Sequence, residues 1–222
     1  MLFDLGGTLI EERDPERWAN EATAVGIEVE AEALSHWFDE VEKENDLAGE
    51  WWSAEEFWRR VLEHASERPV DPARLNAFLD RSRLRPSSPA LFSDVRQCLA
   101  ALRRWRLKLG IVSNSSSESH VRELLDQVGI HRFFETVVSS GTEGVAKPNP
   151  EIFRRAVTRL GVRPEETFYV GNLPHVDAVA AKSAGLHSVW LHRAGTGFGE
   201  DPPEITSLSE LPFLIRAAGR ST

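Results

Sequence analysis

The spacing of hydrophobic residues changes along the chain and separates two kinds of sequence. Between residues 13 and 89, two apolar sets follow i, i+3, i+4, i+7 spacing: Leu34, Trp37, Phe38 and Val41, then Trp58, Val61, Leu62 and Ala65. Ser53 with Glu56 forms a capping box, and Asp71 before Pro72 is a typical helix start. These signals predict three helices in this stretch.

From Ser93 onward, short β-rich runs alternate with amphipathic stretches. The candidate strands are LKLGIVS, TVVSS, TFYV and HSVWLH. The helical stripes between them are Val95, Cys98, Leu99 and Leu102, then Val121, Leu124, Leu125 and Val128, and a further helix begins at Asn149 and Pro150. A Gly- and Pro-rich connection over residues 195–203 precedes a last short helix near 208–217. Strands alternating with helices predict an α/β fold built on a parallel sheet.

Candidate chemistry lies just after the predicted strands, because ligands bind at the carboxyl ends of the strands in such a sheet. Four positions meet this condition: Asp4, Ser113, Lys147 and the loop 171–177. Asp4 precedes Gly6 and Gly7, which let the backbone turn sharply and approach a ligand closely. Its carboxylate is a candidate nucleophile for covalent catalysis, although an Asp beside glycines is also typical of a plain turn.

The segment before Asp4 is short. Only Met1, Leu2 and Phe3 precede it, whereas an internal strand usually has about five residues. We therefore expect either a short first strand or a chain that begins further upstream.

Ser113 and Lys147 are candidates for binding an anion. The hydroxyl of Ser113 and the amide of Asn114 could bind an oxyanion, although Ser113 could instead cap the next helix. Lys147 is one of four lysines beside 22 arginines, and its compact ammonium suits a site that must neutralise a carboxylate and a substrate anion together. A solvated loop lysine is the alternative interpretation.

The loop after the TFYV strand carries Asn172 and Asp177. Oxygens from Asp4 and Asp177, with backbone carbonyls and water, would give the oxygen-rich, partly hydrated surroundings that Mg²⁺ favours. Asp177 could equally be a plain helix cap.

Composition and charge narrow the range of partners. The chain has 222 residues, of which 41% are hydrophobic, so it can bury a sizeable core. A formal charge of −9 predicts a surface that repels nucleic acid and anionic lipid, so an anionic substrate needs a local positive site. Cys98 is the single cysteine, which excludes an internal disulfide. Because we find no leader-like segment and no apolar run of 18 residues, we expect a cytoplasmic protein without membrane or nucleic-acid partners.

In this order, the four positions resemble the motifs of the haloacid dehalogenase superfamily, whose members are mostly phosphatases. FDLGGT is similar to the first motif DxDGT except at its third position, IVSN to the second and KPNPEIF to the third. VGNLPHVD is similar to the fourth motif GDxxxxD, with Asn172 in place of the first aspartate. The resemblance covers residues 1–12 and about 90–192. It implies a Rossmann-like parallel-sheet core domain over residues 1–12 and 90–222, and an inserted all-helical cap domain over 13–89 that selects the substrate.

The resemblance also implies roles for individual residues. Asp4 would be the nucleophile, and Ser113 and Lys147 would bind the phosphate, with Asn114 and Gly7 as further substrate contacts. The ligands of a Mg²⁺ ion would be Asp4, the backbone carbonyl of Gly6, Asn172 and Asp177. Such a site would hydrolyse a small-molecule phosphate ester through an aspartyl-phosphate.

Two departures leave alternatives open. Gly6 lies where the family's phosphatases carry the aspartate that protonates the leaving oxygen and activates water, and loss of such a group typically costs about 10²- to 10⁴-fold in rate. We therefore expect slow or selective phosphatase activity. A metal-independent 2-haloacid dehalogenase fits Gly6 and Asn172, because halide leaves without a proton, but the spacing from Asn172 to Asp177 is that of the phosphatase loop. A catalytically impaired homologue that binds a phosphate ligand is the third interpretation.

Overall fold

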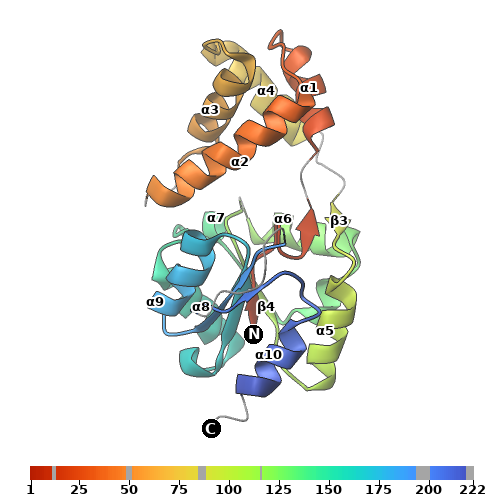
Figure 1. Ribbon diagram of the computed structural model, residues 1–222, viewed down its shortest axis with the longest axis vertical. Helices are drawn as coiled ribbons and strands as arrows, with labels where there is room; N and C mark the ends of the chain where they lie inside the picture. Colours follow the sequence, from red (N-terminus) through yellow and green to blue (C-terminus); the bar gives the residue numbers. More distant parts are fainter. Residues whose placement is uncertain (12–13, 49–51, 85–88, 116, 194–200, 219–222) are drawn as a thin grey trace. The chain divides into compact units, whose positions relative to one another are not determined.

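The computed structural model describes residues 1–11, 14–48, 52–84, 89–115, 117–193 and 201–218. The chain divides into two compact units, shown in Figure 1. Met1–Glu11 with Pro89–Thr222 forms the first, which we call the core unit, and Glu12–Ser88 forms the second, the helical unit. Most of the connection predicted over residues 195–203 lies outside the described residues.

A six-stranded sheet with the order β5-β4-β1-β6-β7-β8 forms the centre of the core unit, and every strand pair in it is parallel. Its strands are β1 (Leu2–Phe3), β4 (Gly110–Ser113), β5 (Thr136–Ser139), β6 (Phe168–Gly171), β7 (His187–Leu191) and β8 (Glu204–Ile205). This arrangement confirms the predicted α/β fold with a parallel sheet. The pattern did not predict β8, because two residues are too short for an alternation signal.

Helices cover both faces of this sheet (Figure 1). The core-unit helices are α5 (Val95–Arg104), α6 (Glu118–Gln127), α7 (Ser140–Glu143), α8 (Pro150–Leu160), α9 (Ala180–Ser183) and α10 (Leu211–Ala218), with single turns η1 (His131–Phe133), η2 (Pro164–Glu166) and η3 (Pro174–Val179). The predicted stripes of α5 and α6 pack with Phe3 against one face, while α8 and α9 pack with Leu2 against the other. Asn149 caps α8 as predicted, accepting a hydrogen bond from Glu151 N at 3.0 Å.

The helical unit is inserted between two short strands that pair with each other. β2 (Ile10–Glu11) and β3 (Ala90–Leu91) form an antiparallel two-stranded sheet within the core unit. The chain therefore leaves and re-enters the core unit at one place, as a helical insertion requires. Strands this short were not predicted from the sequence.

The described part of the helical unit contains four helices, one more than the sequence pattern predicted. They are α1 (Pro15–Thr23), α2 (Ala31–Ala48), α3 (Ala54–Ser66) and α4 (Pro72–Leu84). The predicted starts are confirmed: Ser53 caps α3 by accepting from Glu56 N at 3.1 Å, and Asp71 accepts from Ala73 N at 3.0 Å. The helix that the pattern missed, α1, begins with the same signal, Asp14 before Pro15.

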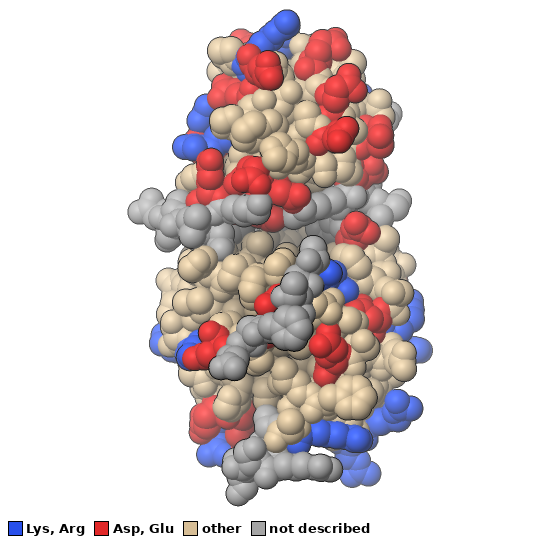
Figure 2. Space-filling model, in the orientation of Figure 1, with Lys and Arg blue, Asp and Glu red and all other residues tan. Residues whose placement is uncertain are grey.

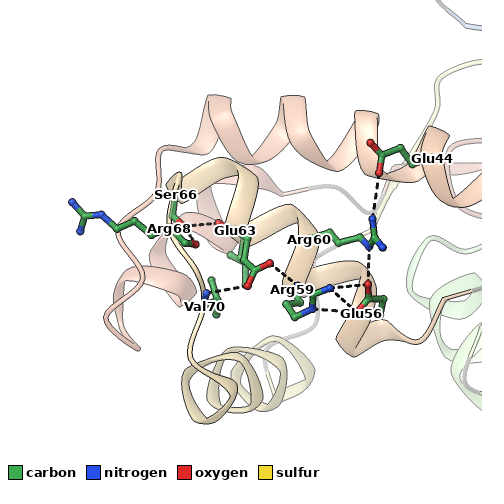
Figure 3. A network of polar contacts seen from close by, with 9 residues as sticks. Glu44, Glu56, Arg59, Arg60, Glu63, Ser66, Arg68 and Val70 are labelled. Atoms are coloured by element: carbon green, nitrogen blue, oxygen red, sulfur yellow. Dashed lines mark hydrogen bonds and ion pairs between the residues drawn. The ribbon is translucent and has the colours of Figure 1, made fainter.

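The helical unit has its own apolar core, and ion pairs lie along α3. Trp18, Phe38 and Trp58 form an aromatic cluster, with Trp18 stacked on Phe38 at a centroid distance of 4.9 Å. In Figure 3 both Arg59 and Arg60 bind Glu56. Side chains one turn apart on a helix support it in this way, although exposed pairs contribute little individually.

Net charge differs sharply between the two units. Residues 12–88 hold 19 Asp and Glu against 10 Lys and Arg, whereas the rest of the chain holds 16 of each. The helical unit therefore carries the whole formal charge of −9, and Figure 2 shows acidic side chains gathered over its drawn face. Among the described helices, none is both long and apolar enough to cross a bilayer.

Candidate active site

The order of the strands brings the carboxyl ends of β1, β4 and β6 side by side. β1 lies between β4 and β6. After β1 the chain forms β4 and β5 on one side, and then crosses to the other side of β1 to form β6, β7 and β8. Such a reversal leaves a crevice at the carboxyl edge of a parallel sheet, where ligands bind. Asp4 follows β1, Ser113 ends β4 and Asn172 follows β6. Three of the positions singled out from the sequence therefore meet at one edge.

Asp4 is held at this edge by its backbone and by both carboxylate oxygens. Its N–H donates to the carbonyl of Val170 at 2.9 Å, which extends the β1–β6 ladder by one residue. Oδ1 accepts from Lys147 Nζ at 2.6 Å, and Oδ2 accepts from the Thr8 hydroxyl at 3.1 Å. The residue is only 6% exposed. A carboxylate fixed in this way has the orientation that a nucleophile would need to attack a group bound beyond the end of the strand.

Lys147 lies in the loop between α7 and α8, and Asn114 anchors its backbone. The Asn114 side chain donates from Nδ2 to the Lys147 carbonyl and accepts at Oδ1 from the Lys147 N–H, both at 2.9 Å. The ammonium donates to Asp4 Oδ1 at 2.6 Å and to Asp177 Oδ1 at 2.7 Å. With 2% exposure, Lys147 is not a solvated loop lysine, so that alternative is wrong.

Asp177 reaches the same ammonium from η3, the π-helical turn that follows β6. Its Oδ1 accepts from Lys147 Nζ, and its Oδ2 accepts from Leu173 N at 3.0 Å. Gly171 permits this approach, since a Cβ at that position would lie 2.3 Å from Asp177 Cγ. The structure therefore brings Asp4, Lys147 and Asp177 into one buried cluster.

Tyr169 also belongs to this cluster, and sequence reasoning missed it. Its hydroxyl donates to Asp177 Oδ1 at 2.7 Å and accepts from Lys147 Nζ at 3.1 Å. The side chain points to the sheet face that carries Leu2, because successive strand residues alternate between faces. Composition could have pointed to this residue, because it is the single tyrosine of the chain and lies in a predicted strand at the start of the fourth motif.

Burial and neighbouring charges change the pKa of Asp4 and of Lys147. Burial raises the pKa of Asp4 to about 6; the charge of Lys147 opposes this shift, and the charge of Asp177 adds to it. Burial alone would lower the pKa of Lys147, but Asp177 and Asp4 outweigh burial and raise that pKa above its ordinary value. Lys147 is therefore a permanent cation, whereas Asp4 changes its charge not far below neutral pH.

Ser113 lies one strand away from Asp4, at the end of β4, and is 7% exposed. The helix that follows is capped by Ser117, whose hydroxyl accepts from His120 N at 3.2 Å. The alternative that Ser113 caps this helix is therefore wrong. Its role as an oxyanion ligand stays a prediction.

Asn172 lies beside Gly6 and Gly7, and its side-chain oxygen and nitrogen can be exchanged by a 180° flip without moving any other atom. With the nitrogen facing Asp4, it donates to Asp4 Oδ2 at 3.2 Å and to the carbonyl of Gly6 at 3.0 Å. With the oxygen facing Asp4, Asn172 Oδ1 lies beside two further acceptors, Asp4 Oδ2 and the Gly6 carbonyl, while the Thr8 hydroxyl can donate to it at 3.3 Å. Gly7 is required here, because it has a φ of 73° and a Cβ would lie 2.9 Å from Asn172 Cγ.

The second orientation of Asn172 fits a magnesium ion. Oxygen ligands at about 2.1 Å from Mg²⁺ and at right angles to each other lie about 3.0 Å apart. The position of the Asn172 oxygen is 3.0 Å from the Gly6 carbonyl and 3.2 Å from Asp4 Oδ2. Among the described residues, no cluster of three or more His, Cys, Asp or Glu side chains forms a metal site, so an ion here would depend on one carboxylate, from Asp4, together with the Gly6 carbonyl and the Asn172 amide oxygen.

The chain is similar in sequence to known hydrolases. Residues 1–185 match the family model of haloacid dehalogenase-like hydrolases. Phosphoserine phosphatase of Thermus thermophilus is 34% identical over 153 residues, which are 68% of this chain and 58% of that protein. (S)-2-haloacid dehalogenase 2 of a Pseudomonas species is 32% identical over 131 residues, 57% of this chain and 56% of that protein. The chain thus spans a little over half the length of these two curated relatives.

A solved structure extends the likeness over nearly the whole fold. The crystal structure of a phosphatase of the same family from Thermococcus onnurineus is similar with a TM-score of 0.63 and 26% identity. The match covers 96% of each chain.

Proposed function

Because this chain belongs to the haloacid dehalogenase-like hydrolase family, we propose that it hydrolyses a small phosphate ester through a covalent intermediate on Asp4. The observation that carries the proposal is the contact of Lys147 Nζ with Asp4 Oδ1 at 2.6 Å, buried at the edge where three strands end. A cation there keeps the carboxylate ionised and offsets negative charge that accumulates as a phosphate approaches it. A phosphatase relative, phosphoserine phosphatase, supports the substrate class.

The proposed reaction has two steps. An oxygen of Asp4 attacks phosphorus, the bond from phosphorus to the ester oxygen breaks, and the alcohol leaves with that electron pair and takes a proton from water. Water then attacks phosphorus of the aspartyl-phosphate, which releases inorganic phosphate and restores the carboxylate. Ser113 and the Asn114 amide would hold the phosphoryl oxygens, while Asn114 holds the Lys147 backbone.

Asp4 Oδ2, the Gly6 carbonyl and Asn172 Oδ1 would hold a magnesium ion in this proposal. When bound, the ion supplies neutralisation of charge on the phosphoryl oxygens. Asp177 has both oxygens engaged by Lys147, Tyr169 and Leu173, so we assign it a different contribution: it holds the ammonium opposite Asp4. We also assign substrate selection to the helical unit, as the cap domain of the family.

A dehalogenase reaction is the second candidate, and the donor orientation of Asn172 favours it. An amide nitrogen facing Asp4 Oδ2 and the Gly6 carbonyl satisfies both acceptors without a metal. Attack of Asp4 on the carbon that bears the halogen would expel halide, which needs no proton, and hydrolysis of the resulting ester would restore Asp4. The dehalogenase relative supports this class as well.

A substrate panel distinguishes these reactions. The chain is assayed with phosphoserine, an aryl phosphate, alkyl phosphates and 2-haloacids, each with Mg²⁺ and with a chelator. Phosphate release that needs Mg²⁺ is the expected result. Halide release that continues in the presence of the chelator would instead identify the dehalogenase reaction. Hydrolysis of neither group, with inorganic phosphate still bound, would show a phosphate-binding homologue without catalysis.

The pH dependence of kcat/KM should follow the ionisation of Asp4. The nucleophile must be charged to attack, and burial raises its pKa to about 6. At limiting Mg²⁺, where most of the enzyme holds no ion on Asp4, we expect kcat/KM to fall about tenfold for each pH unit below this value, and to be flat from pH 7 upward until another group titrates. The measurement is initial rate at low substrate from pH 4.5 to 8, and a profile flat down to pH 4.5 would contradict the assignment.

Restoring a carboxylate at position 6 should raise turnover of substrates with poor leaving groups. Gly6 does not share the positive φ of Gly7, so an L-residue can occupy it, and Gly6→Asp would supply a proton to the departing oxygen. We expect kcat on an alkyl phosphate to rise by about 10-fold or more, with a smaller gain on an aryl phosphate. Gly6→Asn is the matched control, because it has the same size and cannot transfer the proton. Equal rates for the two variants would mean that Gly6 is not the limiting defect.

A further inference from the structure

The ammonium of Lys147 has no spare donor in this structure. An ammonium carries three N–H groups, and these bind Asp4 Oδ1 at 2.6 Å, Asp177 Oδ1 at 2.7 Å and the Tyr169 hydroxyl at 3.1 Å. Two of the acceptors are carboxylates that compete for one cation. Any group that fixes the position of the ammonium between Asp4 and Asp177 therefore also affects the strength of its hydrogen bond to Asp4.

The hydrogen-bond directions around Tyr169 are fixed by chemistry. An ionised carboxylate only accepts and an ammonium only donates, so the phenol must donate to Asp177 and accept from Lys147. A closed ring of three hydrogen bonds therefore joins Lys147 Nζ, the Tyr169 hydroxyl and Asp177 Oδ1. Within this ring Asp177 Oδ1 accepts from the Tyr169 hydroxyl as well as from Lys147 Nζ. The second hydrogen bond weakens the pull of Asp177 on the ammonium.

The tyrosine ring is itself fixed by packing. Tyr169 is fully buried on β6, and its ring meets that of Phe153 edge-on, with centroids 4.8 Å apart and planes at 89°. Its backbone pairs with Leu2 of β1 and with Ser188 of β7. The hydroxyl is thus presented to Lys147 from the rigid centre of the sheet.

We infer that Tyr169 is a positioning residue that holds the Lys147 ammonium on Asp4. Its hydroxyl accepts from the third N–H of the ammonium and donates to Asp177, which then competes less strongly with Asp4 for the cation. The inference rests on the proposed function for its effect on turnover, but not for the coupling of Tyr169 to Asp4. Asp4 and the hydroxyl of Tyr169 each bind the ammonium of Lys147, which joins the two groups by hydrogen bonds. Without the hydroxyl, Asp177 would draw the ammonium toward itself and away from the nucleophile.

Tyr169→Phe tests the effect on catalysis. The ring and its packing on Phe153 stay, while the hydroxyl is removed. We expect kcat on a phosphate ester to fall about tenfold or more, because small misplacements in a catalytic cluster are costly, with KM changed less than about twofold and the melting temperature nearly unchanged. Phe153→Leu is the matched control: it loosens the packing and lowers the melting temperature but keeps the hydroxyl, so it should retain most of kcat. A Tyr169→Phe enzyme with kcat within about twofold of the parent would overturn the inference.

A spectroscopic measurement tests the coupling without any turnover. Because Tyr169 is the single tyrosine, a ¹³C label on the tyrosine ring carbon that bears the hydroxyl gives one signal from the folded protein. We expect Asp4→Asn to move this signal, since a weaker acceptor at position 4 lets the ammonium move toward Asp177 and Tyr169. A signal that does not respond to Asp4→Asn overturns the inference, including when Tyr169→Phe has lowered kcat, because that loss would then come from packing. If no substrate is hydrolysed, this measurement alone decides it.

Discussion

Replacing Asp4 with asparagine is expected to lower hydrolysis by about 10⁴-fold or more while leaving the fold intact, because the variant removes the nucleophile and keeps its shape. The side-chain oxygen of the introduced asparagine can still accept from Lys147, which holds Asp4 Oδ1 at 2.6 Å in the parent. The loss should therefore appear in kcat rather than in the melting temperature. Acid-quenched parent enzyme mixed with substrate should carry a phosphoryl group on Asp4, and the variant should carry none.

Asp126→Asn is the matched control for this experiment. Asp126 is an exposed partner of His131 on the surface of the core unit, so the same chemical change there should leave the rate unchanged. Substantial activity in Asp4→Asn, with the parent and the control equally active, would remove Asp4 from the reaction and with it the covalent mechanism.

Hydrophobic spacing was sufficient to predict the layers of the fold, and failed where elements were short. The stripes that begin at Val95 and Val121 are long enough for the 3.6-residue period to be recognised, and both lie on helices that pack on the sheet. Two-residue strands such as Ile10–Glu11 carry no period, because they exist only through their pairing partners. In α1, only Trp18 and Ala22 among the apolar residues are buried, so its stripe is weak, although Asp14 before Pro15 announced its start.

Most residues of the site could be predicted from the sequence, but the contacts that each side chain makes there could not. Position after a strand identifies Asp4 and Ser113, because topology places strand ends together whatever the side chains are. Lys147 was expected for the same reason, but α7 separates it from β5. The sequence predicts that the amide of Asn114 contributes to an oxyanion site, and the structure adds that its side chain holds the backbone of Lys147. In the sequence, Tyr169 is only one residue of the candidate strand TFYV, because a tyrosine inside an apolar run has the same pattern as a core residue. Its hydroxyl became significant only through the three-dimensional approach of Lys147 and Asp177.

Removing the charge of Lys147 should have the largest effect on stability. Lys147→Met would leave Asp4 and Asp177 buried without the cation that both of them bind, and removing one partner of a buried ion pair costs about 3–5 kcal/mol. We expect the free energy of unfolding of the core unit at pH 8 to fall by about this amount, together with nearly complete loss of hydrolysis. Urea unfolding, followed by a probe in the core unit, measures the first effect.

The pH dependence of this loss identifies its cause. Without Lys147, the pKa of Asp4, which burial already raises to about 6, would rise further above its value in the unfolded chain, so the folded state would take up protons more readily and lose stability as pH rises. The variant should therefore lie closer to the parent at pH 5 than at pH 8. Lys182→Met is the matched control, since Lys182 and Asp201 form an exposed pair worth at most about 1 kcal/mol. If Lys147→Met cost no more than this control at pH 8, the two carboxylates would not depend on Lys147, and the buried cluster could not orient the nucleophile as proposed.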